Sequence, residues 1–131
     1  ICLGMQLLFD HSEEGNACGL GLIKGQVRNF DRDRFKIPLP LPNVGWRFAE
    51  PVGDIGKSLL ANMPQRPRFY FVHGFHVECE DPADVMMISE YGYRYTCAVA
   101  CGNITGFQFH PEKSAAAGLQ LLANFSVWSG D

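Results

Sequence analysis

The stretch Gly106-Phe-Gln-Phe-His-Pro-Glu-Lys-Ser114 (GFQFHPEKS) decides how the second half of the chain is organised. Its apolar and aromatic residues predict a strand over 104–109, which Pro111 stops because proline cannot donate a ladder hydrogen bond. His110 is therefore expected at the end of a strand, where Glu112 can turn back and orient its imidazole. A base held by a carboxylate is the arrangement that activates a nucleophile. A structural histidine at a strand end, beside an acid of the following helix, would show the same local pattern.

The chain opens with Ile1-Cys-Leu-Gly-Met-Gln6 (ICLGMQ), in which Cys2 directly precedes a predicted helix over 3–9. A nucleophile elbow needs this kind of sequence, because the turn is tight and small residues such as Gly4 flank the nucleophile. The N-terminus of the helix favours a thiolate, and the N–H of Leu3 would point at a developing oxyanion. A buried structural cysteine at a helix start is the alternative interpretation.

Between these segments the sequence predicts mainly strands and loops. Alternating prolines predict an extended surface loop over 31–42, closed by Asn43–Trp46. The other expected elements are a short strand ending at Val27, a helix over 55–63, strands over 68–77 (with a bulge or turn at Gly74), 85–89, 95–100 and 104–109, and a final helix that Ser114 caps and that carries Leu119, Leu122 and Phe125 on one face. A helix, several strands and a closing helix indicate an α/β domain.

The composition is that of an ordinary globular domain. The 131 residues are 47% apolar and 19% charged, which excludes intrinsic disorder and leaves room for one core. The net charge of −3 provides no general footprint for nucleic acid or an anionic membrane. No apolar run approaches the ~20 residues that span a bilayer, and no signal peptide is recognised at the start.

Cysteine usage indicates a reducing compartment, and we expect a cytoplasmic protein. The five cysteines are an odd number, and their spacings match no redox or metal motif; they are Cys2, Cys18, Cys79, Cys97 and Cys101. We therefore expect free thiols, with no metal site and no cofactor. The remaining histidines, His11, His73 and His76, are expected to be structural. The charged cluster over 28–36 is expected to be a solvated loop.

Taken together, the segments around Cys2 and His110 resemble the class I (triad) glutamine amidotransferases. The nucleophile motif of that family, G-x-C-x-G-x-Q, is matched by Cys2, Gly4 and Gln6, and its x-x-H-P-E motif is matched by 110–112. Other stretches are similar to one subfamily, the glutaminase subunit of imidazole glycerol phosphate synthase in histidine biosynthesis. They are SEEG from Ser12, GLGLIKGQV from Gly19, PNVGW from Pro42, YFVHGFHV from Tyr70 and LLANF from Leu121.

The resemblance implies a flavodoxin-like open sheet flanked by helices, and a Cys-His-Glu triad. Cys2 would attack the side-chain amide of L-glutamine and form a glutamyl thioester. His110 would protonate the departing ammonia and then activate water, while Glu112 orients His110. Substrate would be held by Gln6, by Leu3 and Gly4 beside the nucleophile, and by the backbone near Gly74 and Phe75.

The resemblance also implies a partner. Ammonia would pass to a cyclase or synthase subunit in a heterodimer, which would make imidazole glycerol phosphate and AICAR. Trp46, Tyr70 and Lys113 match family positions on the surface that faces this partner.

Several residues depart from the family pattern. Asn43 stands where the family usually has His, Arg47 replaces an Asn, and 39–41 are extra. Gly74 and Phe75 stand where Ser or Thr and then Tyr are frequent. These departures leave open a paralogous subunit that feeds a sugar-modifying synthase of surface polysaccharide, a stand-alone γ-glutamyl hydrolase, and a catalytically silent docking subunit.

The resemblance further implies that these residues are the C-terminal portion of one glutamine amidotransferase domain, starting at the elbow. The N-terminal strands and a glycine-rich loop, which supplies the other oxyanion N–H, would precede Ile1. A polypeptide of 1–131 alone is therefore expected to be poorly active, because losing one such donor costs about 10²–10³ in rate.

Overall fold

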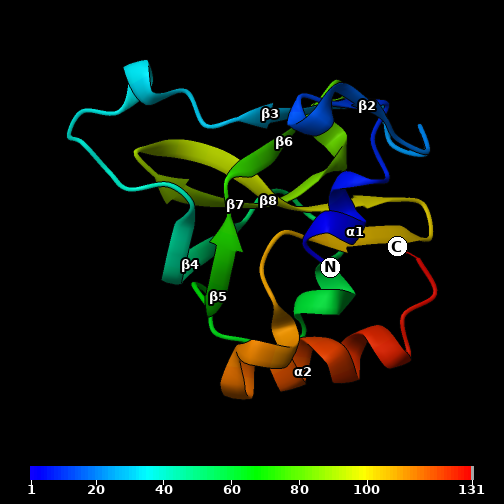
Figure 1. Ribbon diagram of the computed structural model, residues 1–131. Helices are drawn as coiled ribbons and strands as arrows, with labels where there is room; N and C mark the ends of the chain where they lie inside the picture. The colour runs from blue at the N-terminus through cyan, green and yellow to red at the C-terminus, as the bar shows by residue number, and fades with distance from the viewer. Residues whose placement is uncertain (131) are drawn as a thin grey trace.

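The computed structural model describes residues 1–130 and is built on a strongly curved mixed sheet (Figure 1). Within those residues nine strands follow the order β2-β1-β3-β6-β8-β7-β4-β5, with β9 paired to β8. The strands are β1 (His11–Ser12), β2 (Ala17–Cys18), β3 (Gly25–Asn29), β4 (Asn43–Pro51), β5 (Arg68–His73), β6 (Phe75–Cys79), β7 (Val85–Tyr91), β8 (Tyr93–Cys101) and β9 (Ile104–Phe107). The helices are α1 (Leu3–Gln6) and α2 (Ala115–Ser126), and the 3₁₀ turns are η1 (Glu14–Asn16), η2 (Arg32–Arg34), η3 (Lys57–Leu60), η4 (Pro82–Asp84) and η5 (Pro111–Lys113).

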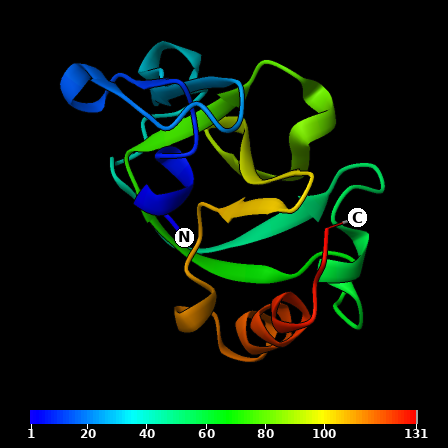
Figure 2. The ribbon, with the colours of Figure 1, turned by 90° about the vertical axis from the view of Figure 1, so that its right-hand side faces the viewer.

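This arrangement confirms the α/β class that the sequence predicts. α2 packs below β5 and α1 lies beside β9 (Figures 1 and 2). Of the strand pairs in 1–130, β1 with β3 is parallel and all the others are antiparallel. The strands predicted near 68–77, 85–89, 95–100 and 104–109 are present, and Gly74 separates β5 from β6 as expected.

The sheet curves until its far end meets the segment that follows β9. In the described part of the chain β5 pairs with β4 alone, so its other edge is free to accept hydrogen bonds. The backbone N–H of His110 donates to the carbonyl of Tyr70 on that edge over 3.0 Å. Strands β4, β5, β7, β8 and β9 therefore enclose the larger core, in which the rings of Phe69 and Phe109 stack with centroids 3.9 Å apart.

A second, smaller core anchors α1 to the sheet. It is formed by Met5, Phe9, Ile23, Val27, Val77 and Val99. Gly106 permits this packing, because a Cβ at that position would lie 2.6 Å from Cγ of Met5. The turn that carries Cys2 is thus held at a fixed distance from β9.

The prediction that Asn43–Trp46 only closes a loop is wrong, since these residues begin β4. The strand pairs with β5 from Asn43 opposite His73 to Phe48 opposite Arg68, and then with β7. The prolines before Asn43 and the glycine at position 45 give this part of the sequence the pattern of a loop. Pairing with strands distant along the chain outweighs the weak local preference.

The predicted helix over 55–63 is also wrong, because this segment forms only the short turn η3. Gly56 and Asn62 have φ of 64° and 61°, which an α-helix does not accommodate. The Nδ2 of Asn124 on α2 donates to the carbonyls of Leu59 and Ala61, at 2.8 Å each. Those carbonyls are therefore held by α2 and not by a local helix.

The final helix begins after Ser114 as predicted, but the Ser114 side chain does not cap it and bonds Tyr70 and His110 instead. The apolar stripe of the helix faces outward. Leu119, Leu122 and Phe125 are 69%, 36% and 48% exposed, whereas Gly118 and Leu121 are buried. Gly118 lies so close to the carbonyl of Pro111 that an added Cβ would be 1.8 Å from its oxygen. This close approach turns the Gly118 side of α2 toward the sheet.

The loop over 31–42 is extended, as expected, but part of it is packed onto the domain. Phe35, Leu39 and Leu41 lie against the larger core, and the carbonyl of Pro40 accepts a hydrogen bond from the hydroxyl of Tyr91. The loop is therefore anchored by its apolar residues, while its charged residues stay in solvent.

Candidate functional site

Cys2 sits in a strained turn that directly precedes α1 and lies beside the end of β9. Its φ of 51° and ψ of −112° are unusual for a residue with a side chain. The N–H of Cys2 donates to the carbonyl of Phe107 over 2.7 Å, and its own carbonyl accepts from the N–H groups of Met5 and Gln6. Contacts on both sides thus fix the strained conformation, which is the property of a nucleophile elbow.

The free edge of β5 brings the cysteine and histidine segments together. The Sγ of Cys2 lies 3.8 Å from the carbonyl oxygen of Val72, and His110 is bonded through its N–H to the carbonyl of Tyr70. Residues that are two positions apart on a strand, such as Tyr70 and Val72, lie ~7 Å from each other, and their carbonyls point the same way. Both segments therefore meet the same short length of β5 from the same side.

His110 and Glu112 form a close pair on the turn η5. The Nδ1 of His110 lies 2.6 Å from Oε1 of Glu112, so the carboxylate fixes the proton on Nδ1 and leaves Nε2 free to accept one. Partial burial alone would raise the pKa of Glu112, but its hydrogen bond with His110 and the nearby charges of His110 and Lys113 lower that pKa overall. The carboxylate is therefore ionised at neutral pH.

Gln108 is a site residue that the sequence analysis missed. Its side chain is fully buried, its Nε2 donates to the Sγ of Cys2 over 3.6 Å, and its Oε1 accepts from Nε2 of Gln6 over 3.1 Å. The signal was available, because Gln108 precedes His110 by two residues in a strand of otherwise apolar neighbours. A buried amide there needs polar partners, and the cysteine sulfur is one of them.

The residues expected to bind substrate lie around the same point. Nε2 of Gln6 also donates to the carbonyl of Phe75 over 3.3 Å, which connects α1 to the Gly74–Phe75 turn. Leu3 provides the first N–H of α1, where a helix has no internal acceptor for it. Space surrounds Gly4, because a Cβ there would find no atom within 4 Å among those described.

The three residues expected to face a partner are linked to His110 through β5. Trp46 and Tyr70 are opposite each other in the β4–β5 pair, with ring centroids 6.1 Å apart, and Trp46 is 40% exposed. The N–H of Tyr70 donates to Oγ of Ser114, whose hydroxyl donates to the carbonyl of His110. Lys113 lies on η5 between Glu112 and Ser114 and is exposed.

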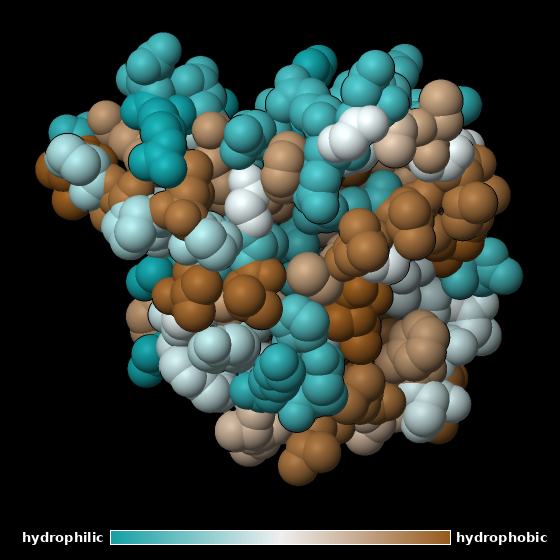
Figure 3. Space-filling model, viewed as in Figure 1, coloured by the Kyte–Doolittle hydropathy of each residue, from teal (hydrophilic) through white to brown (hydrophobic). Residues whose placement is uncertain are grey.

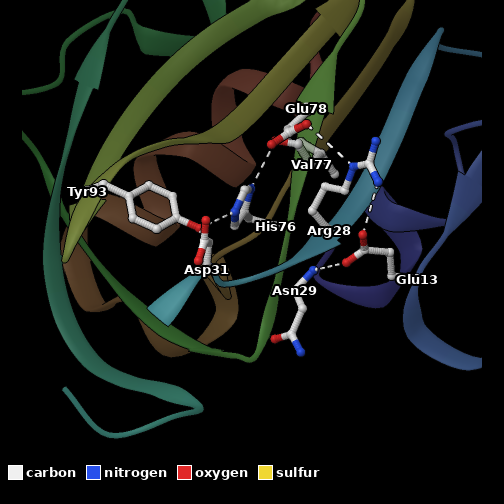
Figure 4. A network of polar contacts seen from close by, with 8 residues as sticks. All are labelled: Glu13, Arg28, Asn29, Asp31, His76, Val77, Glu78 and Tyr93. Carbon is white, nitrogen blue, oxygen red and sulfur yellow. Dashed lines mark hydrogen bonds and ion pairs between the residues drawn. The ribbon is translucent and has the colours of Figure 1, made fainter. Parts of the chain in front are cut away.

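His76 has a structural environment, away from Cys2. Its Nε2 lies 2.8 Å from the hydroxyl of Tyr93 and its Nδ1 faces the carbonyl of Val77 (Figure 4). Burial lowers the pKa of His76, so its ring is neutral at physiological pH. Beside it, Arg28 bridges Glu13 and Glu78 on the surface (Figure 4).

The five cysteines are all free thiols. Among residues 1–130 no group of His, Cys, Asp or Glu side chains is arranged to hold a metal ion. Over the same residues, none of the helices combines the length and apolar character needed to cross a membrane. Apolar side chains gather on the part of the surface where α1 lies (Figure 3). Leu3 and Leu7 are 59% and 49% exposed.

The sequence of the chain is similar to the sequences of known proteins. The family model "Glutamine amidotransferase class-I" matches residues 1–128. The imidazole glycerol phosphate synthase subunit HisH of Leptospira borgpetersenii is 46% identical over 126 residues, covering 96% of this chain and 61% of that protein. The subunit of the same name from Nitrosospira multiformis is 48% identical over 132 residues, covering 98% and 61%. The chain thus spans about three fifths of the length of these relatives.

A solved structure shows the same fold. The crystal structure of a glutamine amidotransferase from Thermotoga maritima superposes with a TM-score of 0.51 at 24% identity. The match covers 78% of this chain and 39% of that one.

Proposed function

The chain belongs to the class I glutamine amidotransferases, and we propose that it carries the glutaminase site of an imidazole glycerol phosphate synthase. The observation that carries the proposal is the strained Cys2 turn, with its sulfur beside Gln108 and the His110–Glu112 pair on the same edge of β5. The similarity to subunits of that synthase supports the choice of partner reaction.

In the proposed reaction Cys2 gives its proton to Nε2 of His110, and its thiolate adds to the side-chain carbonyl carbon of glutamine. The N–H of Leu3 stabilises the oxyanion that forms. The C–N bond then breaks, His110 returns the proton to the leaving nitrogen, and ammonia departs from a glutamyl thioester.

Water completes the cycle. His110 takes a proton from water, and the resulting hydroxide adds to the thioester. The C–S bond then breaks, His110 returns that proton to the sulfur of Cys2, and glutamate is released. Glu112 keeps the His110 imidazole oriented throughout and stabilises its protonated form. Ammonia passes to the synthase subunit, which docks on the surface of Trp46, Tyr70 and Lys113 as a heterodimer.

The complex would act as a lyase in histidine biosynthesis, and we place it in the cytoplasm. Five free thiols, with Cys2 required as a thiolate, fit a compartment that keeps cysteine reduced. No metal or cofactor enters the proposed mechanism.

The proposal is tested with the complete gene product that contains these residues. Glutamate release from L-glutamine is measured in the presence of the synthase, for the wild type, for Cys2→Ser and for the exposed-cysteine control Cys18→Ser. Cys2→Ser should abolish glutamine-dependent turnover, whereas Cys18→Ser should retain it. The synthase reaction supplied with an ammonium salt should be unaffected in both.

Two results would contradict the proposal. Retained glutamine hydrolysis in Cys2→Ser would exclude Cys2 as the nucleophile. Activation by a sugar-modifying synthase, with none by the histidine-pathway synthase, would assign the chain to the paralogous branch.

A further inference from the structure

We propose that Asn43 and His73 are positioning residues of the glutamine site, through a row of hydrogen bonds that runs from Arg47 to Cys2. The row comprises Arg47, Asn43, His73, the carbonyl of Phe75, Gln6 and Gln108, and is called the polar row below. The inference rests on the function proposed above, and adds to it residues that do not touch Cys2.

The centre of the polar row is His73, a buried imidazole whose proton position is determined by its partners. Burial lowers the pKa of His73 to about 4, so the ring is neutral at physiological pH. Its Nδ1 lies 2.7 Å from the carbonyl of Phe75 and must carry the proton. Its Nε2 is then an acceptor, 3.1 Å from Nδ2 of Asn43 and 3.2 Å from the hydroxyl of Tyr95.

On the active-site side the polar row converges on one carbonyl. The oxygen of Phe75 accepts from His73 and from Nε2 of Gln6, so two buried side chains hold the turn after β5. Gln6 also donates to Gln108, which donates to the Sγ of Cys2. Without the His73 hydrogen bond the Phe75 carbonyl would lose one of these two donors, and the orientation of Gln6 would be less restricted.

On the surface side the polar row reaches the strand proposed to face the synthase. Nε of Arg47 donates to Oδ1 of Asn43 over 3.1 Å, and Asn43 itself is fully buried. The amide of Asn43 cannot rotate without losing either this contact or its contact with His73. Arg47 is partly buried on β4, the strand that also carries Trp46, so the polar row begins on the strand proposed to face the synthase.

Two replacements of His73 distinguish a role in the polar row from a role in packing alone, because each replacement retains a different hydrogen bond of the histidine. An asparagine amide reproduces Nδ1 of histidine and a glutamine amide reproduces Nε2. His73→Asn keeps a donor for the Phe75 carbonyl, whereas His73→Gln keeps the contacts with Asn43 and Tyr95 and loses that donor. In the complete gene product with its synthase, we expect His73→Gln to raise KM for glutamine about tenfold with a smaller change in kcat. His73→Asn loses only the contacts on the Asn43 side, so it should raise KM about threefold, clearly less than His73→Gln.

The control is His76→Gln, a second buried histidine whose partners are outside the polar row. It should leave KM unchanged. Equal KM values for His73→Asn and His73→Gln in folded proteins, or a similar rise in His76→Gln, would overturn the inference. A wild type that does not hydrolyse glutamine would instead contradict the proposed function, so the two failures are distinguishable.

If the His73 variants do not fold, a substitution at the protein surface tests whether the polar row affects KM for glutamine. Arg47→Met removes the donor to Asn43, and Arg68→Met is its control, because Arg68 contacts the ring of Phe48 and not the polar row. We expect Arg47→Met to raise KM about threefold, and Arg68→Met to leave KM unchanged. An unchanged KM in Arg47→Met, or an equal rise in both variants, would show that the polar row does not position the site.

Discussion

Gln108 donates a hydrogen bond from Nε2 to the Sγ of Cys2 across 3.6 Å, although 106 positions separate the two residues in the sequence. The amide is buried and its other end is held by Gln6, so it has one stable orientation. A donor in this position stabilises a thiolate more than a thiol, because the hydrogen bond is stronger to the charged form.

Replacement of Gln108 by leucine should therefore slow thioester formation. We expect kcat to fall about tenfold, since a hydrogen bond to a charged group contributes about 1.5–3 kcal/mol and part of it is already present in the resting enzyme. Rapid-quench measurement of the glutamyl thioester gives the rate of that step. Gln26→Leu on β3 is the control, and an equal loss in both variants would remove Gln108 from the site.

Glu112→Gln should reduce kcat about 100-fold, because a neutral amide orients His110 but does not stabilise its protonated form. The lowered pKa of Glu112 adds a prediction for stability. The carboxylate contributes stability above its ordinary pKa, and this is lost as the pH falls through the lowered value. The difference in unfolding free energy between wild type and Glu112→Gln should thus vanish in acid. A difference that does not change with pH would contradict the assignment.

Burial of His73 should make the protein less stable in mild acid. Its pKa is about 4 in the folded protein and about 6.5 when unfolded, so the unfolded chain binds more protons between these values. The free energy of unfolding should be flat above pH 6.5 and fall toward pH 4, by at most about 1.4 kcal/mol per pH unit for this group.

Urea titrations of the wild type and of His73→Asn across this range measure the effect. His76 contributes in the same direction, because burial lowers its pKa too. His73→Asn should therefore reduce the slope without removing it. An identical slope in both proteins would mean that His73 is not buried as a neutral ring.

Gly118→Ala should destabilise the domain by about 1–3 kcal/mol, because the new Cβ would meet the carbonyl of Pro111 at 1.8 Å. The displaced turn carries Glu112, so activity should fall as well. Gly4→Ala is the matched control for stability, since a Cβ there has room and alanine favours a helix. Thermal unfolding of both variants tests this, and equal melting temperatures would exclude the close contact at Gly118.

Glutaminase activity should be low for the protein alone and rise about 100-fold when the synthase and its acceptor bind. Lys113 directly follows Glu112, and Tyr70 is bonded to both His110 and Ser114, so a partner on the proposed surface would act close to His110 and Glu112. Lys113→Ala should weaken this activation, with Lys57→Ala on η3 as the control. Equal rates with and without the partner would favour the stand-alone hydrolase.

The amino-acid sequence by itself determined the short-range parts of the site. The Pro111 turn, the Glu112 partner of His110 and the start of a helix after Ser114 all follow from residues within a few positions of one another, whereas β9 ends at Phe107, before the predicted end at 109. The β8–β9 hairpin and the break at Gly74 have the same origin. Proline and glycine act on their immediate neighbours, so these features need no knowledge of the fold.

Only the tertiary structure decided which distant residues meet. β4 is a strand because it pairs with β5 and β7, and 55–63 is not a helix because Asn124, 65 positions away from Leu59, holds its carbonyl. The outward apolar face of α2 follows from the Gly118–Pro111 contact. Gln108 beside Cys2 and Asn43 beside His73 depend on how the sheet curves. Such contacts depend on the pairing of distant strands and on volume exclusion, neither of which leaves a local pattern in the sequence.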